Sequence, residues 1–321
     1  MAEIPATPQP TPNNRPIAGA LWMLATGFSF VAVTAIVKHG AQDLPAAQSA
    51  FLRYVLGLVF LLPMIGPMRR ARLTPRQLRL FTMRGAAHTI GVILWFYAMT
   101  RITIAEVTAM NYMTPIYITL GAAIFLGERL AVRRIIAILL AFAGALIILR
   151  PGIREITDGH IGMIGTAIFF AVSYLTAKRM ADEVNALVVV GMLSITVTIG
   201  LAPFAFAVWR TPTPEELFWM FLVALFATLG HYTMTRAFAV APVTVTQPIT
   251  FLQLLWSVLL GALFFGEPAD IWVILGGTVI LGSATFITIR EAMLKRRTRS
   301  SAANGEPAES GSEPQTKPQI P

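Results

Sequence analysis

The feature that most constrains this chain is a hydrophobic unit that occurs twice. Tyr97–Arg101 reads Tyr-Ala-Met-Thr-Arg at the end of one apolar segment, and Tyr232–Arg236 reads Tyr-Thr-Met-Thr-Arg at the end of another. A second apolar segment with an internal proline follows in each copy, and it closes on a Gly-Glu pair at Glu128 and at Glu267. Duplication of this kind indicates a fold built from two similar halves.

The composition places most of the chain in lipid. Hydrophobic residues make up 55% of the sequence and charged residues 13%, whereas a soluble domain carries about 25% charged residues. The net charge of +9 comes from arginines in short loops between apolar segments. These arginines indicate topology, so we expect a lipid bilayer and no nucleic acid as a partner. The absence of cysteine excludes disulfides and thiolate chemistry.

The expected fold is an all-α polytopic membrane protein with ten transmembrane helices, arranged as a 5+5 inverted-topology repeat. Each apolar segment has about the ~20 residues needed to cross the hydrocarbon core. The segments must be helical because backbone groups in lipid need internal hydrogen-bond partners. The predicted helices cover residues 17–37, 46–65, 80–99, 104–125, 132–149, 161–177, 186–208, 217–235, 242–265 and 271–289.

The segments outside the two repeats are polar. We expect residues 17–150 to form the first repeat and residues 161–290 the second. Residues 1–16 are rich in Pro, Thr and Asn, and residues 295–321 in Ser, Glu, Pro and Gly, so we expect both to be disordered cytoplasmic tails. The first apolar segment, 17–37, is too long for a signal-peptide core and lacks a preceding basic region, which favours a retained helix.

The distribution of basic residues predicts the orientation. With both termini inside, 18 of the 25 Lys and Arg residues lie on the inner side and five on the outer side, with Arg53 and Arg84 within helices. This bias predicts a multi-pass protein of the cytoplasmic membrane with both termini cytoplasmic. Because five helices is an odd number, the second half must enter the membrane in the opposite direction. Exchanging the conformations of two such halves converts an inward-open into an outward-open state.

The two copies differ in length at one place. Arg101 and Glu128 are 27 residues apart, whereas Arg236 and Glu267 are 31 residues apart. Four residues correspond to about one helical turn. We therefore expect the ninth helix to be longer or more tilted than the fourth.

These features resemble the EamA branch of the drug/metabolite transporter superfamily. The resemblance covers residues 17–290 and includes the Gly-Glu pairs and the glycine-rich last helix of each half, with Gly144 in one and Gly276-Gly277 in the other. The stretch around Gln253, with Gly-Glu at Glu267, is similar to the subset that contains riboflavin and S-adenosylmethionine carriers. The resemblance implies a central cavity lined mainly by the third, fourth, eighth and ninth helices. It identifies no binding residue.

Arg53 lies about seven residues into the second predicted helix. At 1.5 Å per residue it is ~10 Å below the outer surface, and an arginine at this depth rarely faces lipid. One interpretation is that it holds an anionic or carbonyl-rich substrate. The other is that it pairs with helix carbonyls or with Glu106, near the outer end of the fourth helix. If paired with Arg53, Glu106 would act as a gate at the outer mouth.

Polar residues of the fourth and ninth helices are further candidates for substrate binding. Asn111 and Tyr112 lie just above Pro115, which frees a backbone carbonyl and could open a polar spot on a cavity wall. Gln253 and Trp256 lie near the middle of the ninth helix, where a glutamine needs a partner. The alternative for all four is that they tie helices together.

Two histidines and several aromatic residues complete the candidates. His88 in the third helix and His231 in the eighth could each relay protons, since imidazole titrates near neutral pH. His88 is also a candidate for substrate binding, and His231 for gating or coupling. The alternative is a satisfied polar residue between helices. Arg84, near the inner end of its helix, should snorkel to the interface. Tyr174 is deep enough to stack on a planar ligand. The aromatic residues near helix ends resemble an interfacial belt: Trp95, Tyr97 and Tyr232.

The predicted function is secondary transport of a small organic metabolite, with uptake of a vitamin or cofactor such as riboflavin as the leading hypothesis. Export of amino acids or other metabolites is the alternative. No Walker A, His-Glu-x-x-His or Gly-x-Ser-x-Gly motif occurs, so we expect neither an ATPase nor a membrane enzyme, and no cofactor or metal. A receptor or scaffold would not explain the inverted duplication. We expect a monomer or a homodimer.

The inverted topology can be tested by labelling, because the chain has no cysteine of its own. Single cysteines introduced next to Glu128 and next to Glu267 should react with an impermeant thiol reagent from opposite sides of the membrane. Inside-out and right-side-out vesicles provide the two faces. Labelling of both positions from the same side would disprove the inverted pair.

Overall fold

The computed structural model describes the chain without its ends and a few loop residues, and no β-strand occurs in the described residues. The described residues are 15–126, 132–153, 155–180, 183–184, 186–241 and 243–303. Glu128, one of the two repeated Gly-Glu positions, lies outside them, as do the first 14 residues and those after 303.

The helices coincide with the predicted apolar segments. Six helices are long and apolar enough to span a membrane among the residues described: α1, α7, α8, α9, α10 and α12. The remaining four spans stay predictions. The elements are α1 (Pro16–Gly40), α2 (Ala46–Gly57), the 3-10 helix η1 (Leu58–Met64), α3 (Ile65–Arg70), α4 (Pro75–Met99), α5 (Ile104–Asn111), α6 (Thr114–Leu126), α7 (Val132–Leu149), α8 (Asp158–Met180), α9 (Ala186–Ala207), α10 (Pro214–Val240), α11 (Val243–Phe265) and α12 (Ile271–Ala303).

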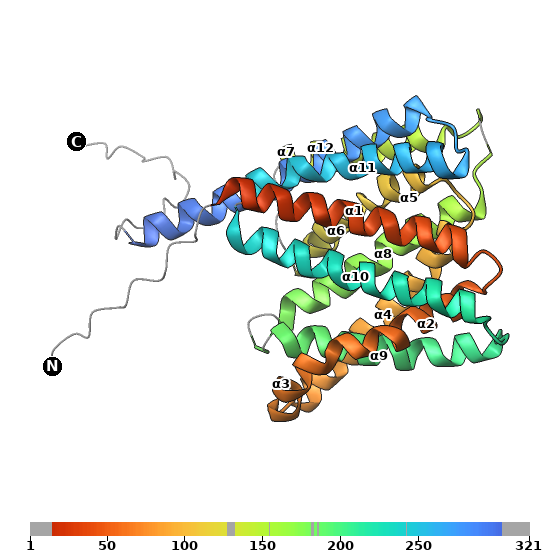
Figure 1. The fold of residues 1–321 in the computed structure, drawn as a ribbon. Helices are drawn as coiled ribbons and strands as arrows, with labels where there is room; N and C mark the ends of the chain where they lie inside the picture. The colour runs from red at the N-terminus through yellow and green to blue at the C-terminus, as the bar shows by residue number, and fades with distance from the viewer. Residues whose placement is uncertain are drawn as a thin grey trace, which may run out of the picture.

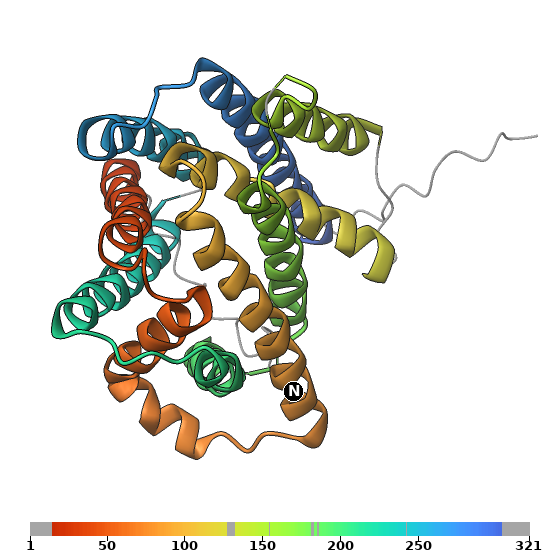
Figure 2. The same cartoon turned by 90° about the vertical axis from the view of Figure 1, so that its right-hand side faces the viewer.

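The two halves interleave in one bundle (Figure 1). The most extensive packing joins helices of different halves: α1 with α10, α4 with α8, and α7 with α12. In these pairs the first helix of each half packs on the third helix of the other, and the two last helices pack together, as a two-fold relation between the halves requires. Viewed along the bundle, α4 and α8 are central, with α1 and α10 on one side (Figure 2).

Both described ends of the chain lie at one end of the bundle. In Figure 1, α1 begins and α12 ends at the left. The backbone N–H of Arg15 donates to the carbonyl of Val240 at 2.9 Å, which joins the start of α1 to the end of α10. We call this the terminal end of the bundle and the other the distal end. Which end faces the cytoplasm stays a prediction.

The second and fourth predicted helices are interrupted, where we expected continuous ones. In the second, α2 gives way to η1 near Pro63, whose missing N–H removes one helical hydrogen bond. In the fourth, α5 ends at Asn111 and α6 begins at Thr114. Pro115 cannot donate to the Asn111 carbonyl, and the chain turns instead through i→i−3 bonds, with the Met113 N–H 3.0 Å from the Met110 carbonyl.

The four extra residues of the second half lie in α10. We expected its helix to end near Arg236, but α10 continues to Val240. The next helix, α11, has 23 residues, the same length as the α5–α6 segment 104–126. Over the described residues the ninth predicted helix is therefore no longer than the fourth, and the alternative that it is more tilted stays a prediction. A charged residue near a helix end, such as Arg236, does not have to terminate the helix.

The last helices of the two halves cross where both have glycine. A Cβ atom on Gly144 of α7 would lie 2.7 Å from the Gly276 carbonyl oxygen of α12, so the two backbones are in direct contact. Beyond its apolar part α12 continues to Ala303, into the segment that we expected to be disordered.

Candidate functional site

Polar and aromatic side chains from four helices gather inside the bundle. Electrostatic interactions connect Arg53 with His88, Tyr174 and His231. They also connect Arg84 with His88 and Tyr174. We call this group the Arg53 cluster, and its members are Arg53 and Tyr54 of α2, Arg84 and His88 of α4, Tyr174 of α8, and His231 of α10.

The guanidinium of Arg53 lacks a counter-charge. Its Nε atom is buried without a hydrogen-bond partner, and its Cζ atom lies 4.3 Å from the centroid of the Tyr54 ring. Arg53 forms no ion pair with any part of the chain that the structure describes. The side chain as a whole is half-buried. A guanidinium carries five N–H donors, so those of Arg53 can donate to a ligand.

Arg84 is held by the fold. It is only 5% exposed, and its guanidinium donates to the Val189 carbonyl of α9 at 3.0 Å. We expected this side chain to snorkel to the membrane interface, and that prediction was wrong. The carbonyl partner on α9 replaces the water that an interfacial arginine would bind.

His88 is the centre of an aromatic stack. Its Nδ1 atom lies 3.1 Å from the Ser173 hydroxyl, and its ring stacks on Phe170 with 4.7 Å between centroids and 22° between planes. Trp95 and Tyr174 flank the same phenyl ring at 6.2 Å and 6.4 Å. Both stacked rings are buried, so the stack joins α4 to α8 within the cluster.

Tyr174 and His231 are the accessible members of the cluster. Tyr174 is 38% exposed, and His231 is also exposed. The His231 ring also lies edge-on to Phe30 at 5.2 Å.

The other predicted substrate residues lie along α5 and α11. The Tyr112 hydroxyl donates to the Thr250 carbonyl at 2.8 Å and ties the helix break to α11. Gln253 packs against α1, because a Cβ on Gly27 would lie 3.3 Å from the Gln253 Cβ. Asn111 is half-buried and Trp256 is 41% exposed. The structure thus brings Arg53, His88, Tyr174 and His231 together. The residues that lie elsewhere, along α5 and α11, are Asn111, Tyr112, Gln253 and Trp256.

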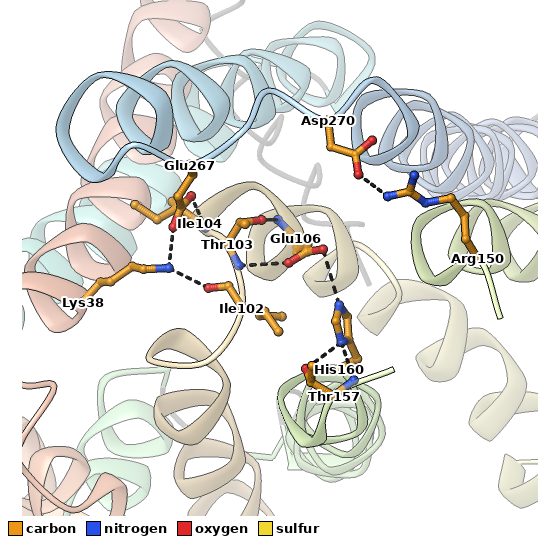
Figure 3. A network of polar contacts seen from close by, with 10 residues as sticks. All are labelled: Lys38, Ile102, Thr103, Ile104, Glu106, Arg150, Thr157, His160, Glu267 and Asp270. Carbon is orange, nitrogen blue, oxygen red and sulfur yellow. Dashed lines mark hydrogen bonds and ion pairs between the residues drawn. The ribbon is translucent and has the colours of Figure 1, made fainter. Parts of the chain in front are cut away.

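A second polar group lies at the distal end of the bundle (Figure 3). The Lys38 ammonium forms an ion pair with Glu267 and donates to the Ile102 carbonyl at 2.9 Å. The Glu267 carboxylate accepts the Ile104 N–H at 2.9 Å, at the first residue of α5. An anion at a helix N-terminus satisfies a free N–H and complements the helix dipole.

Glu106 belongs to this second group. Its backbone and side chain form a capping box with Thr103, and its carboxylate lies 3.4 Å from the His160 Nε2. Both side chains are almost fully buried, at 3% and 1% exposure. The His160 Nδ1 lies 2.8 Å from the Thr157 hydroxyl. Glu106 therefore contacts His160 and Thr103 at the distal end of the bundle.

We call the second group the distal network. It also includes an ion pair between Arg150 and Asp270. The Lys38–Glu267 and Arg150–Asp270 ion pairs and the Glu106–His160 contact each join the first half of the chain to the second (Figure 3). Sequence reasoning missed His160 and Asp270. Lys38 and Glu267 carry opposite charges close to the ends of apolar segments, and that pair was the available signal. The members are Lys38, Glu106, Arg150, His160, Glu267 and Asp270.

The two groups of polar residues offer different chemistry. Among the residues described, no three His, Cys, Asp or Glu side chains are placed to hold a metal ion. The Arg53 cluster offers hydrogen-bond donors, a positive charge and aromatic faces. The distal network offers complementary charges that are mutually satisfied.

Comparison with known proteins gives a family and named relatives. Residues 17–150 and 157–289 each match the EamA-like transporter family. A riboflavin transporter of Vibrio cholerae is 29% identical over 90% of this chain and 99% of its own. An S-adenosylmethionine uptake transporter of Rickettsia conorii is 24% identical over 88% and 96%. A pseudopaline exporter of Pseudomonas aeruginosa is 26% identical over 82% and 93%.

One solved structure has a similar fold. It covers 84% of this chain and 96% of its own length with a TM-score of 0.54 and 19% sequence identity. At this identity the likeness concerns the fold alone.

Proposed function

Because the chain belongs to the EamA-like transporter family, we propose that it is a secondary transporter that moves a small organic metabolite across the cytoplasmic membrane by alternating access. The family and the transporter names of the relatives indicate a membrane transporter rather than an enzyme. The interleaved halves support alternating access, since each main helix pair contains one helix from each half.

The leading substrate hypothesis is a flat, carbonyl-rich vitamin such as riboflavin, taken up into the cell. The observation that carries it is the unpaired guanidinium of Arg53 beside the stack of His88 on Phe170. A guanidinium donates to adjacent carbonyl oxygens, and aromatic faces bind a planar ring system. Two such features side by side fit a ring whose edge carries carbonyl groups. The named riboflavin transporters among the relatives support the same class.

The second candidate is export of an amino-acid-like metabolite. It is favoured by the full positive charge of Arg53, which suits a carboxylate better than a neutral carbonyl. A relative named as a pseudopaline exporter shows that export occurs among similar proteins. The two hypotheses share the Arg53 cluster and differ in the ligand and the direction.

The distal network is the proposed outer gate. Ion pairs between the halves stabilise a closed distal end, and separating the halves there must break them. In this proposal Glu106 acts as a gate residue through His160 rather than through Arg53. His231, an exposed member of the Arg53 cluster, is the candidate for coupling transport to protons.

Counterflow into liposomes should identify the substrate class. We expect purified protein, preloaded with unlabelled riboflavin, to accumulate labelled riboflavin at least about fivefold above empty liposomes. S-adenosylmethionine and a panel of amino acids serve as competing ligands. Exchange of amino acids without riboflavin exchange would contradict the leading hypothesis and support the alternative.

Arg53→Ala should abolish transport while the protein still inserts and folds. The variant removes a cation that no described side chain requires as an ion-pair partner, and loss of a charged hydrogen bond to a ligand weakens binding by about 2–3 kcal/mol, or roughly 30- to 150-fold. The measurement is ligand affinity together with counterflow. Arg79→Ala, an exposed arginine at the start of α4, is the matched control. Normal transport by a well-folded Arg53→Ala protein would disprove the binding role.

Lys38→Met should open the distal end. The substitution leaves Glu267 buried without its cation, which destabilises the closed state. With Tyr174→Cys as a reporter in the Arg53 cluster, the rate of modification by an impermeant thiol reagent from the outer side should rise at least tenfold, equivalent to about 1.4 kcal/mol. Lys38→Arg keeps the charge and is the matched control. An unchanged rate in Lys38→Met would exclude the distal network as a gate.

A further inference from the structure

A groove runs between α7 and α12 on the outside of the bundle, away from both groups described above. Its volume is about 510 Å³, and apolar side chains form most of its walls. Both helices are among those apolar enough to span the membrane, so the groove opens toward lipid. The lining includes Ile136, Ala137 and Leu140 from α7 and Val279, Gly282 and Phe286 from α12.

The groove exists because the two helices diverge from a close crossing. At Gly276 the backbone of α12 is in direct contact with Gly144 of α7. Further along α12, a Cβ atom placed on Gly282 would meet nothing within 4 Å. The space that opens between the helices is therefore a feature of the backbone, and the missing side chain of Gly282 makes it deeper.

A basic residue lies at the terminal end of the groove. Arg133, in the first turn of α7, lines the same space and is exposed. It forms no ion pair with the residues described. The terminal end is the one that the distribution of Lys and Arg predicts to face the cytoplasm. An apolar groove with an unpaired cation at the level of the lipid headgroups complements the two parts of an anionic lipid.

We propose that this groove binds one phospholipid of the inner leaflet with an anionic headgroup, such as phosphatidylglycerol. One acyl chain fills the groove between α7 and α12, and the phosphate group contacts Arg133. A second copy of the chain is a poorer occupant, because a helix is about 10 Å wide with its side chains and packs on ridges rather than into a deep slot lined by glycine.

Such a lipid would touch both halves of the transporter. α7 ends the first repeat and α12 ends the second, and the two pack directly together. A lipid chain wedged between them would contribute to the stability of this contact. The binding itself does not depend on which substrate is transported, so a failed substrate hypothesis leaves this proposal unaffected.

Native mass spectrometry of the full chain, delipidated and then titrated with either phosphatidylglycerol or phosphatidylcholine, tests the proposal. We expect one phosphatidylglycerol to be retained with at least tenfold preference. Gly282→Phe, which fills the groove, should lower the retention of both lipids at least fivefold. Arg133→Gln, which removes the cation, should lower the preference for phosphatidylglycerol at least fivefold. Gly66→Phe is the matched control for the first, because a Cβ there also meets nothing within 4 Å. Arg79→Gln is the matched control for the second.

Three results would overturn the proposal. Equal retention of the two lipids by the unmodified chain would mean that only general annular lipid is bound. Arg133→Gln changes an exposed side chain and leaves the helix packing intact. An unchanged lipid preference in this variant would disprove the proposed contact between Arg133 and the headgroup. Conversion of a dimer to a monomer by Gly282→Phe would identify a second copy of the chain as the occupant.

Discussion

The structure depends on satisfying the first N–H groups of a helix that starts inside the protein. α5 begins at Ile104, which is fully buried, and the N–H of that residue would be unpaired in a region with little water. Glu267 from the other half supplies the acceptor, and Lys38 neutralises the carboxylate. The same few atoms therefore cap a helix, balance a charge and join the two repeats.

The distal network and the Arg53 cluster contrast in how their charges are balanced. Lys38 and Arg150 each have a carboxylate partner from the other half. Arg53 has an aromatic neighbour and an unpaired Nε. Among the described residues, the two arginines of the Arg53 cluster, Arg53 and Arg84, have no carboxylate partner, and each has a buried Nε atom without a hydrogen-bond partner. This contrast is the physical reason for placing the ligand at Arg53 and the gate at Glu106.

The helices and the duplication were predictable from the sequence because apolar length and repetition are local signals. The break at Tyr112 was partly predictable, since Pro115 removes one backbone donor in any context. Other features depend on tertiary contacts that leave no local signal. Arg236 could not be placed inside α10 from the sequence, and the burial of Arg84 depends on a carbonyl of α9. His160 is a single histidine at the start of a helix, and its role depends on Glu106, which is 54 residues away.

Because the halves interleave, the Arg53 cluster contains residues from two of the packed helix pairs. His88 and Tyr174 belong to the tightly packed pair α4–α8, and His231 belongs to the pair α1–α10. Arg53 lies on α2, which contacts both α4 and α10. A ligand held by all four side chains would connect the two pairs, and it would lose contacts if the pairs moved apart. The distal network also contains residues of both helix pairs, since His160 is on α8 and Lys38 is on α1. Movement between the pairs would therefore change the binding site and the gate together, which is the coupling that alternating access requires.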